Sequence, residues 1–71
     1  MEHKRKPEAL TLRKLVQLIA GIETMDALHE VVDLTQYSYR HDTITCMEES
    51  YLLVILGWMR IAIEQLDREG K

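Results

Sequence analysis

Tyr-Leu-Leu-Val-Ile-Leu-Gly-Trp-Met-Arg-Ile-Ala-Ile, from Tyr51 to Ile63, is the most apolar stretch of this 71-residue chain and contains its single tryptophan. Just upstream, Thr45 and Glu48 have the spacing of a capping box, in which both side chains bond to free backbone amides at a helix start. The stretch is therefore expected to belong to a helix that is buried on most sides, in its own core or against another chain.

The apolar stretch is too short to cross a membrane. It holds about a dozen apolar residues, whereas a transmembrane helix needs roughly 20, and Arg60 lies within it. We therefore expect a helix from about Asp42 to Arg68 on which the positions that are not apolar form one thin stripe. On a helical wheel this stripe consists of Glu49, Gly57, Arg60, Glu64 and Asp67.

The remaining surface of this helix leaves two arrangements open. Two short upstream helices are expected to leave one side of it uncovered, for a second copy or a different partner, and the alternative is that they cover it completely within a monomer. Trp58 and Met59 suit such a contact, because tryptophan anchors interfaces and methionine packs adaptably. Gly57 would allow a partner to approach closely.

Two amphipathic helices are expected upstream. The first follows Pro7, and its apolar residues recur every three or four positions, as one face of a helix requires. That face consists of Leu12, Leu15, Val16, Ile19 and Ile22. Gly21 ends this helix, and Thr24 caps a second one, with Asp26 in its first turn. The second helix is expected to end near Thr35 and to bury Met25, Leu28, Val31 or Val32, and Thr35.

The segment Gln36–Thr43 has no helical periodicity and is expected to be a loop. Tyr37 and Tyr39 alternate with polar residues, and the β-branched run Thr43–Thr45 follows, so a short hairpin is the alternative. An isolated pair of strands is only marginally stable in water, which favours the loop.

Length and charge limit the classes of protein. A chain of this size forms one domain of marginal stability, here expected over residues 7–69 with a basic arm at residues 1–6. Its single cysteine, Cys46, excludes an intramolecular disulfide and indicates a cytoplasmic protein. The net charge is −3, and residues 1–14 carry five of the nine basic side chains. Nucleic-acid contact is therefore expected to be indirect at most, with Lys4, Arg5 and Lys6 as the candidate phosphate contacts.

The sequence contains no constellation that indicates catalysis, a metal or a cofactor. His29 and Asp33 are one helical turn apart, but two ligands do not make a metal site. His41 and Cys46 flank a helix start without a second ligand pair of zinc-site spacing. The glycines are isolated, so no phosphate-binding loop is present. We expect neither enzymatic activity nor a small-molecule substrate.

The stretch Ile22–Val31 resembles the Thr-Ile-Asp-Thr-Leu-Glu-x-Val segment of the Hha/YmoA family of small nucleoid-associated modulators. The matching positions are Thr24, Asp26, Leu28, Val31 and, after this helix, Tyr37. Leu12, Leu15 and Leu18 resemble the first helix of the family, and Glu49 and Arg60 have the spacing of its long third helix. The resemblance implies a three-helix fold and docking on H-NS-type transcriptional silencers.

The chain departs from the family pattern at two places. The family's Ala-Asp-His-Arg signature is here Gly57-Trp58-Met59-Arg60, so Trp58 replaces the acidic residue that engages H-NS. His29 replaces the glutamate of the second helix. The partner-binding residues that the resemblance implies are Asp26, His29, Glu30, Trp58, Met59 and Arg60.

Together these observations predict an all-α bundle of two short helices and one long C-terminal helix, expected to dimerise. The leading functional hypothesis is a non-enzymatic regulatory adaptor that docks on a protein partner of H-NS type. The alternative is a homodimeric accessory protein with no DNA-related role. Its expected dimer interface consists of Leu52, Ile55, Leu56, Met59 and Ile63.

Overall fold

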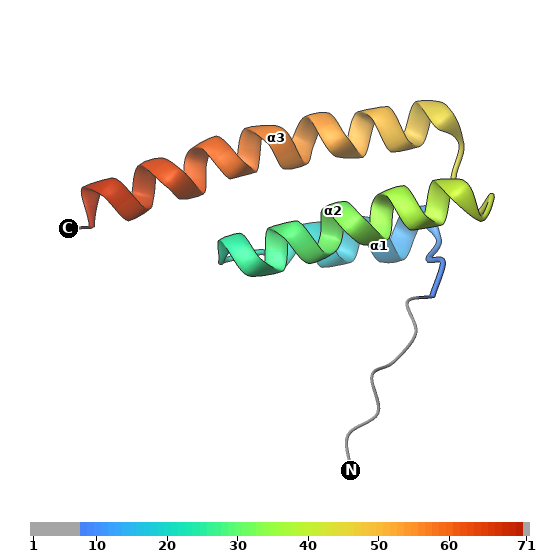
Figure 1. Ribbon diagram of the computed structural model, residues 1–71, viewed down its shortest axis with the longest axis horizontal. Helices are drawn as coiled ribbons and strands as arrows, with labels where there is room; N and C mark the ends of the chain where they lie inside the picture. Colours follow the sequence, from blue (N-terminus) through green and yellow to red (C-terminus); the bar gives the residue numbers. More distant parts are fainter. Residues whose placement is uncertain (1–7, 71) are drawn as a thin grey trace, which may run out of the picture.

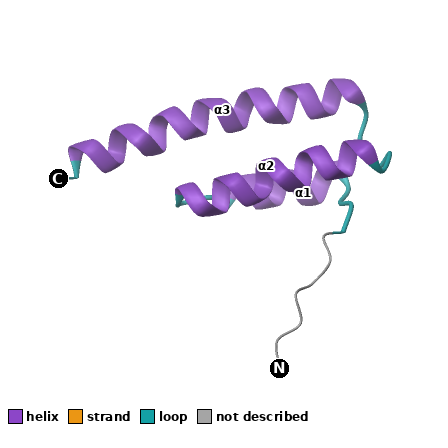
Figure 2. Ribbon diagram, in the orientation of Figure 1, coloured by secondary structure: helices purple, strands orange, loops and turns teal. Residues whose placement is uncertain are grey.

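Three helices make up the described part of the protein in a computed structural model, which describes residues 8–70 (Figure 1). They are α1 (Leu12–Ala20), α2 (Met25–Arg40) and α3 (Cys46–Glu69). Short loops join them, and no strand occurs in residues 8–70 (Figure 2). The predicted all-α fold with a long last helix is confirmed. The expected basic arm at Lys4–Lys6 lies outside the described residues.

α2 and α3 lie side by side and run in opposite directions, with α1 behind α2 in the view of Figure 1. The C-terminal end of α3 extends past the beginning of α2. Among the described residues, no helix has the length and apolar character that a membrane crossing requires.

α1 is shorter than the sequence predicts. Instead of following Pro7 directly, it begins at Leu12, because Thr11 adopts an extended backbone and caps it. The Thr11 side chain accepts a hydrogen bond from the Lys14 amide at 3.3 Å. The helix ends at Gly21, as predicted, and buries Leu15 and Ile19.

α2 is longer than predicted, because it continues past Thr35 to Arg40. Neither the expected loop nor the alternative hairpin forms over residues 36–40. The buried stripe of this helix continues, but through the hydroxyl residues Thr35 and Ser38, both fully buried. The Thr35 hydroxyl donates to the Val31 carbonyl at 2.8 Å, which offsets the cost of its burial. Apolar periodicity therefore fades in a segment that remains helical.

The backbone of Leu10 is tied to the far end of α2. Its amide donates to the Ser38 hydroxyl at 2.9 Å. Its carbonyl accepts a hydrogen bond from the Thr43 hydroxyl at 2.6 Å. We call this pair of contacts the Leu10 clasp. It joins the segment before α1 to the end of α2 and to the turn that follows.

α2 ends in a Schellman motif. The amide of Thr43 donates to the Ser38 carbonyl and that of Asp42 to the Tyr39 carbonyl, both at 3.1 Å. These are the two bonds that define the motif. Asp42 has a φ of 61°, the left-handed conformation that the motif requires at this position. The chain thereby reverses direction within a few residues and leads into α3.

α3 begins at Cys46, later than the expected start near Asp42, because Thr45 caps it with the predicted capping box. The Thr45 amide donates to the Glu48 carboxylate at 2.9 Å, and the Glu48 amide donates to the Thr45 hydroxyl at 3.1 Å. One apolar core joins all three helices and the turn between α2 and α3. The buried core consists of Leu15, Ile19, Leu28, Val31, Ile44, Leu52 and Leu56.

Candidate interaction surface

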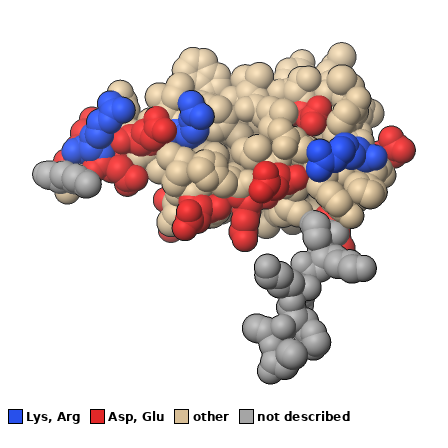
Figure 3. All heavy atoms as spheres, in the orientation of Figure 1, with Lys and Arg blue, Asp and Glu red and all other residues tan. Residues whose placement is uncertain are grey.

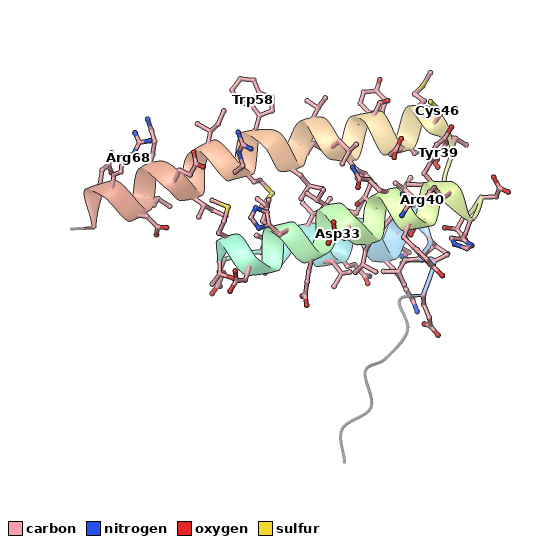
Figure 4. All side chains as sticks on the ribbon, in the orientation of Figure 1. Asp33, Tyr39, Arg40, Cys46, Trp58 and Arg68 are labelled. Carbon is pink, nitrogen blue, oxygen red and sulfur yellow. The ribbon has the colours of Figure 1, made fainter. Side chains whose placement is uncertain are left out.

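The side of α3 that faces away from the other two helices is apolar and exposed. Its central residues are Met47, Tyr51, Val54, Trp58 and Ile61, which we call the outer stripe. Each is at least half exposed, and Trp58 is exposed to 70%. Their separations alternate between four and three residues, which places them on one face of the helix. In Figure 4 Trp58 points away from α2.

The outer stripe has almost no charge around it. Residues 50–59 contain no charged side chain. In Figure 3 the middle of the upper margin, along α3, is free of charged atoms, whereas acidic groups gather below it. Arg60 lies outside the outer stripe and 4.0 Å from Glu64, and both are exposed, so this ion pair contributes little to stability. The surface around Trp58 is therefore hydrophobic rather than charged.

This apolar surface exists because α3 has two apolar faces and only one is used in the fold. Leu52 and Leu56 are buried against α1 and α2, with Met59 and Ile63 partly buried beside them. The two short helices leave the opposite face uncovered. The arrangement in which they enclose α3 completely is thus wrong. Contiguous apolar surface of this kind marks protein interaction sites.

Most of the expected dimer interface lies in the core of the single chain. Leu52 and Leu56 are buried there, and Met59 and Ile63 pack against the same core, so these residues do not form a free surface. Of that set only Ile55 is exposed, beside the outer stripe. Both faces of α3 repeat with the same spacing, so periodicity alone does not indicate which one the fold covers.

The residues that the family resemblance implies are not gathered on one surface. Asp26, His29 and Glu30 are exposed on α2, away from its buried side. Trp58 is exposed on α3 and points away from α2, whereas Met59 is partly buried against the core. Arg60 is exposed on α3, two residues after Trp58 and therefore on a different side of the helix from the outer stripe. The structure therefore places Trp58 away from the residues on α2.

The titratable side chains do not form a site. Within residues 8–70, no three His, Cys, Asp or Glu side chains cluster in a way that would hold a metal ion. The His41 ring lies 4.1 Å from the Tyr37 ring, measured between centroids. Cys46 is exposed at the start of α3, near Tyr39 (Figure 4). Electrostatic repulsion from Cys46, together with a hydrogen bond to it, raises the pKa of Tyr39.

Comparison with known proteins adds no family. No family model, no curated protein and no solved structure matches the chain. The resemblance to the Hha/YmoA family stays a prediction, and the outer stripe is the feature from which a function can be argued.

Proposed function

We propose that this protein is a non-enzymatic adaptor that docks on a protein partner through the outer stripe of α3. The observation that supports it is an apolar, uncharged helix face on which Trp58 is the most exposed residue. Tryptophan is among the residues that contribute most when an interface buries them. Met47 can adapt its flexible side chain to an irregular partner surface.

The partner we propose to test first is the oligomerisation region of an H-NS-type silencer. The resemblance of Ile22–Val31 to the Hha/YmoA family supports this choice. The net charge of −3 supports a regulatory role exerted through protein contact, since phosphate backbones repel an acidic surface. Replacement of the family's acidic residue by Trp58 implies an apolar contact at that position.

Isothermal titration calorimetry with this H-NS region tests the proposal. We expect Trp58→Ala to weaken binding by about 2 kcal/mol or more, roughly thirtyfold, because it removes the largest and most exposed side chain of the outer stripe. Leu18→Ala is the matched control, since Leu18 is an exposed apolar residue of α1, and should bind like the wild type. Wild-type affinity of Trp58→Ala would contradict the proposed surface.

A second variant asks whether the contact extends to α2. Glu30 is exposed there, and Glu30→Ala removes its charge without disturbing the core. An unchanged affinity would confine the contact to α3, whereas a loss would add α2 to it. Absence of any binding by the wild-type protein would exclude the H-NS region as the partner.

A further inference from the structure

We infer that the outer stripe is covered by a second copy of this chain, with the two α3 helices packed antiparallel. The inference rests on the docking surface of the proposed function, and it names a second copy as the occupant of that surface in place of the H-NS region. Five features of the described residues carry it: the length of the stripe, its lack of charge, the order of large and small residues along it, the charges at the ends of α3, and Gly57.

The stripe fits another long helix. Beyond Ile61, the alternation of four and three residues continues through Gln65 to Arg68. Such spacing is the contact line of two long helices that cross at a shallow angle. The chain itself supplies a helix with this line, since α3 spans 24 residues. α1 has only nine residues.

The exposed side of α2 does not provide such a partner surface. It carries the charged residues Asp26, Glu30, Asp33 and Arg40, all exposed. Pairing of the outer stripe with that side would bury charges against apolar groups, which is costly. A second α3 has an apolar face of the same length and brings no charge to the centre of the contact.

A twofold interface must be complementary to itself, because the same patch is used on both chains. Charged patches fail this condition when like charges meet. Residues 50–59 carry no charge, so the centre of the outer stripe can face its own copy without repulsion. The centre of the outer stripe, where the two α3 helices would be closest, is therefore electrostatically compatible with its own copy.

The order of side chains favours the antiparallel direction. With the twofold axis at the level of Leu56, Trp58 meets the partner's Val54, and Tyr51 meets the partner's Ile61. A large ring thus lies opposite a smaller aliphatic group in both layers, as interdigitated packing requires. A parallel pair would instead place each residue beside its own copy, with Trp58 against the partner's Trp58.

The charged residues at the two ends of α3 also favour the antiparallel direction. Arg68 points to the side of α3 on which Trp58 lies (Figure 4). In the antiparallel pair it approaches the acidic first turn of the partner's α3, which contains the partner's Glu48. A cation is favourable near carboxylates, but unfavourable beside another arginine. In a parallel pair the two Arg68 side chains would meet.

Gly57 is otherwise unexplained. A Cβ atom at this position would meet nothing within 4 Å, so the fold of the single chain does not require glycine there. Glycine in the middle of a helix is destabilising relative to alanine. At the edge of the outer stripe near the proposed axis, it allows the backbone of the partner's α3 to approach closely. The antiparallel pair gives this residue a role that the monomer lacks.

Disulfide trapping in the full chain tests the direction of pairing. Two proteins are made in a Cys46→Ser background, one with Met47→Cys and one with Gln65→Cys, and incubated in a glutathione redox buffer. The antiparallel pair places position 47 opposite position 65, so we expect a covalent dimer only in the mixture. A covalent dimer from Met47→Cys alone would overturn the antiparallel arrangement. Absence of any covalent dimer would do the same.

Light scattering tests whether the protein dimerises through the outer stripe. We expect the wild-type protein to be dimeric at high micromolar concentration, and Trp58→Glu to raise the dimer dissociation constant roughly thirtyfold or more. Leu18→Glu, which places the same charge on exposed α1, should remain dimeric. Circular dichroism verifies that both variants keep their helices. A dimeric Trp58→Glu protein at wild-type affinity would overturn the inference.

Failure of this inference can be separated from failure of the docking proposal. Suppose that the wild-type protein is monomeric and binds the H-NS region, and that Trp58→Ala abolishes this binding. The second copy would then be excluded, while the outer stripe would remain the docking surface. A wild-type protein that is monomeric and whose binding is unaffected by Trp58→Ala would contradict both proposals.

Discussion

Asp42 is the one residue of the described chain other than glycine with a positive φ. It allows α2 to end in a Schellman motif, and aspartate is among the few residues that tolerate the left-handed conformation. Its carboxylate also lies at the C-terminal end of α2, where the helix dipole disfavours negative charge. The turn between α2 and α3 is therefore formed at a local energetic cost.

We expect Asp42→Gly to raise the free energy of unfolding by about 1 kcal/mol, because glycine adopts this conformation without strain and carries no charge. Urea denaturation followed by circular dichroism measures the change. Asp42→Asn is the matched control, since it removes the charge and keeps a side chain. A Gly variant less stable than the wild type would show that the Asp42 side chain stabilises the turn.

Tyr39 gives a second prediction, in alkaline solution. Repulsion from Cys46 raises the pKa of Tyr39, so we expect Cys46→Ser to lower that pKa toward its usual value. Phenolate absorbance measures it, with Tyr39→Phe variants of both proteins to isolate the Tyr39 contribution.

The raised pKa of Tyr39 also determines whether stability rises or falls with pH. A pKa that is raised in the folded state contributes stability at pH values below the unfolded pKa. That contribution is lost as the pH rises through the folded pKa. The stability of the Cys46→Ser variant should therefore fall less steeply above pH 10 than that of the wild type. Equal slopes would contradict the assignment to Cys46.

Two of the three helix caps are predicted correctly from the sequence, because their signals are local. Thr24 and Thr45 are identified by their neighbours along the chain, and both cap a helix as predicted. The end of α2 is missed, since Thr35 and Ser38 continue its buried face without apolar side chains. Their burial depends on hydrogen bonds that local sequence does not reveal. The start of α1 is set too early for a related reason, because Thr11 caps it and Pro7 does not.

The capping box of α3 can be tested directly. Thr45→Ala removes the acceptor for the Glu48 amide, and we expect it to cost about 1 kcal/mol of unfolding free energy. Ser50→Ala is the matched control, because Ser50 is exposed inside α3 and should change stability by less than about 0.5 kcal/mol. If urea denaturation shows that Thr45→Ala and Ser50→Ala lose the same unfolding free energy, the capping box makes no specific contribution to stability.

One apolar face of α3 stabilises the fold of the single chain, and the other is exposed and available for the proposed contact. Sequence predicts that such a helix carries more apolar surface than two short helices cover, and the exposed stripe agrees. Sequence does not show which face is free, because Leu52 and Leu56 repeat with the same spacing as Val54 and Trp58. That choice depends on how α1 and α2 pack, which is a property of the whole molecule.

Two alanine variants separate these roles. Leu56→Ala should lower the free energy of unfolding by about 2–5 kcal/mol at any protein concentration, because it opens a cavity in the core. Trp58→Ala should cost less than about 0.5 kcal/mol in dilute solution, where an exposed side chain contributes little. Its cost should grow with protein concentration if the outer stripe is covered by a second copy. A large cost of Trp58→Ala in dilute solution would place Trp58 in the fold of the single chain.

The Leu10 clasp has a practical consequence for where this chain can be shortened. Both backbone groups of Leu10 are bonded to the end of α2 and its turn, and Ser38 is fully buried beneath them. A protease cut or truncation before residue 9 leaves these bonds in place. Removal of Leu10 itself would leave the Ser38 hydroxyl without its donor and open the far end of the bundle to water. The clasp therefore marks the N-terminal boundary of the smallest fragment that keeps this fold.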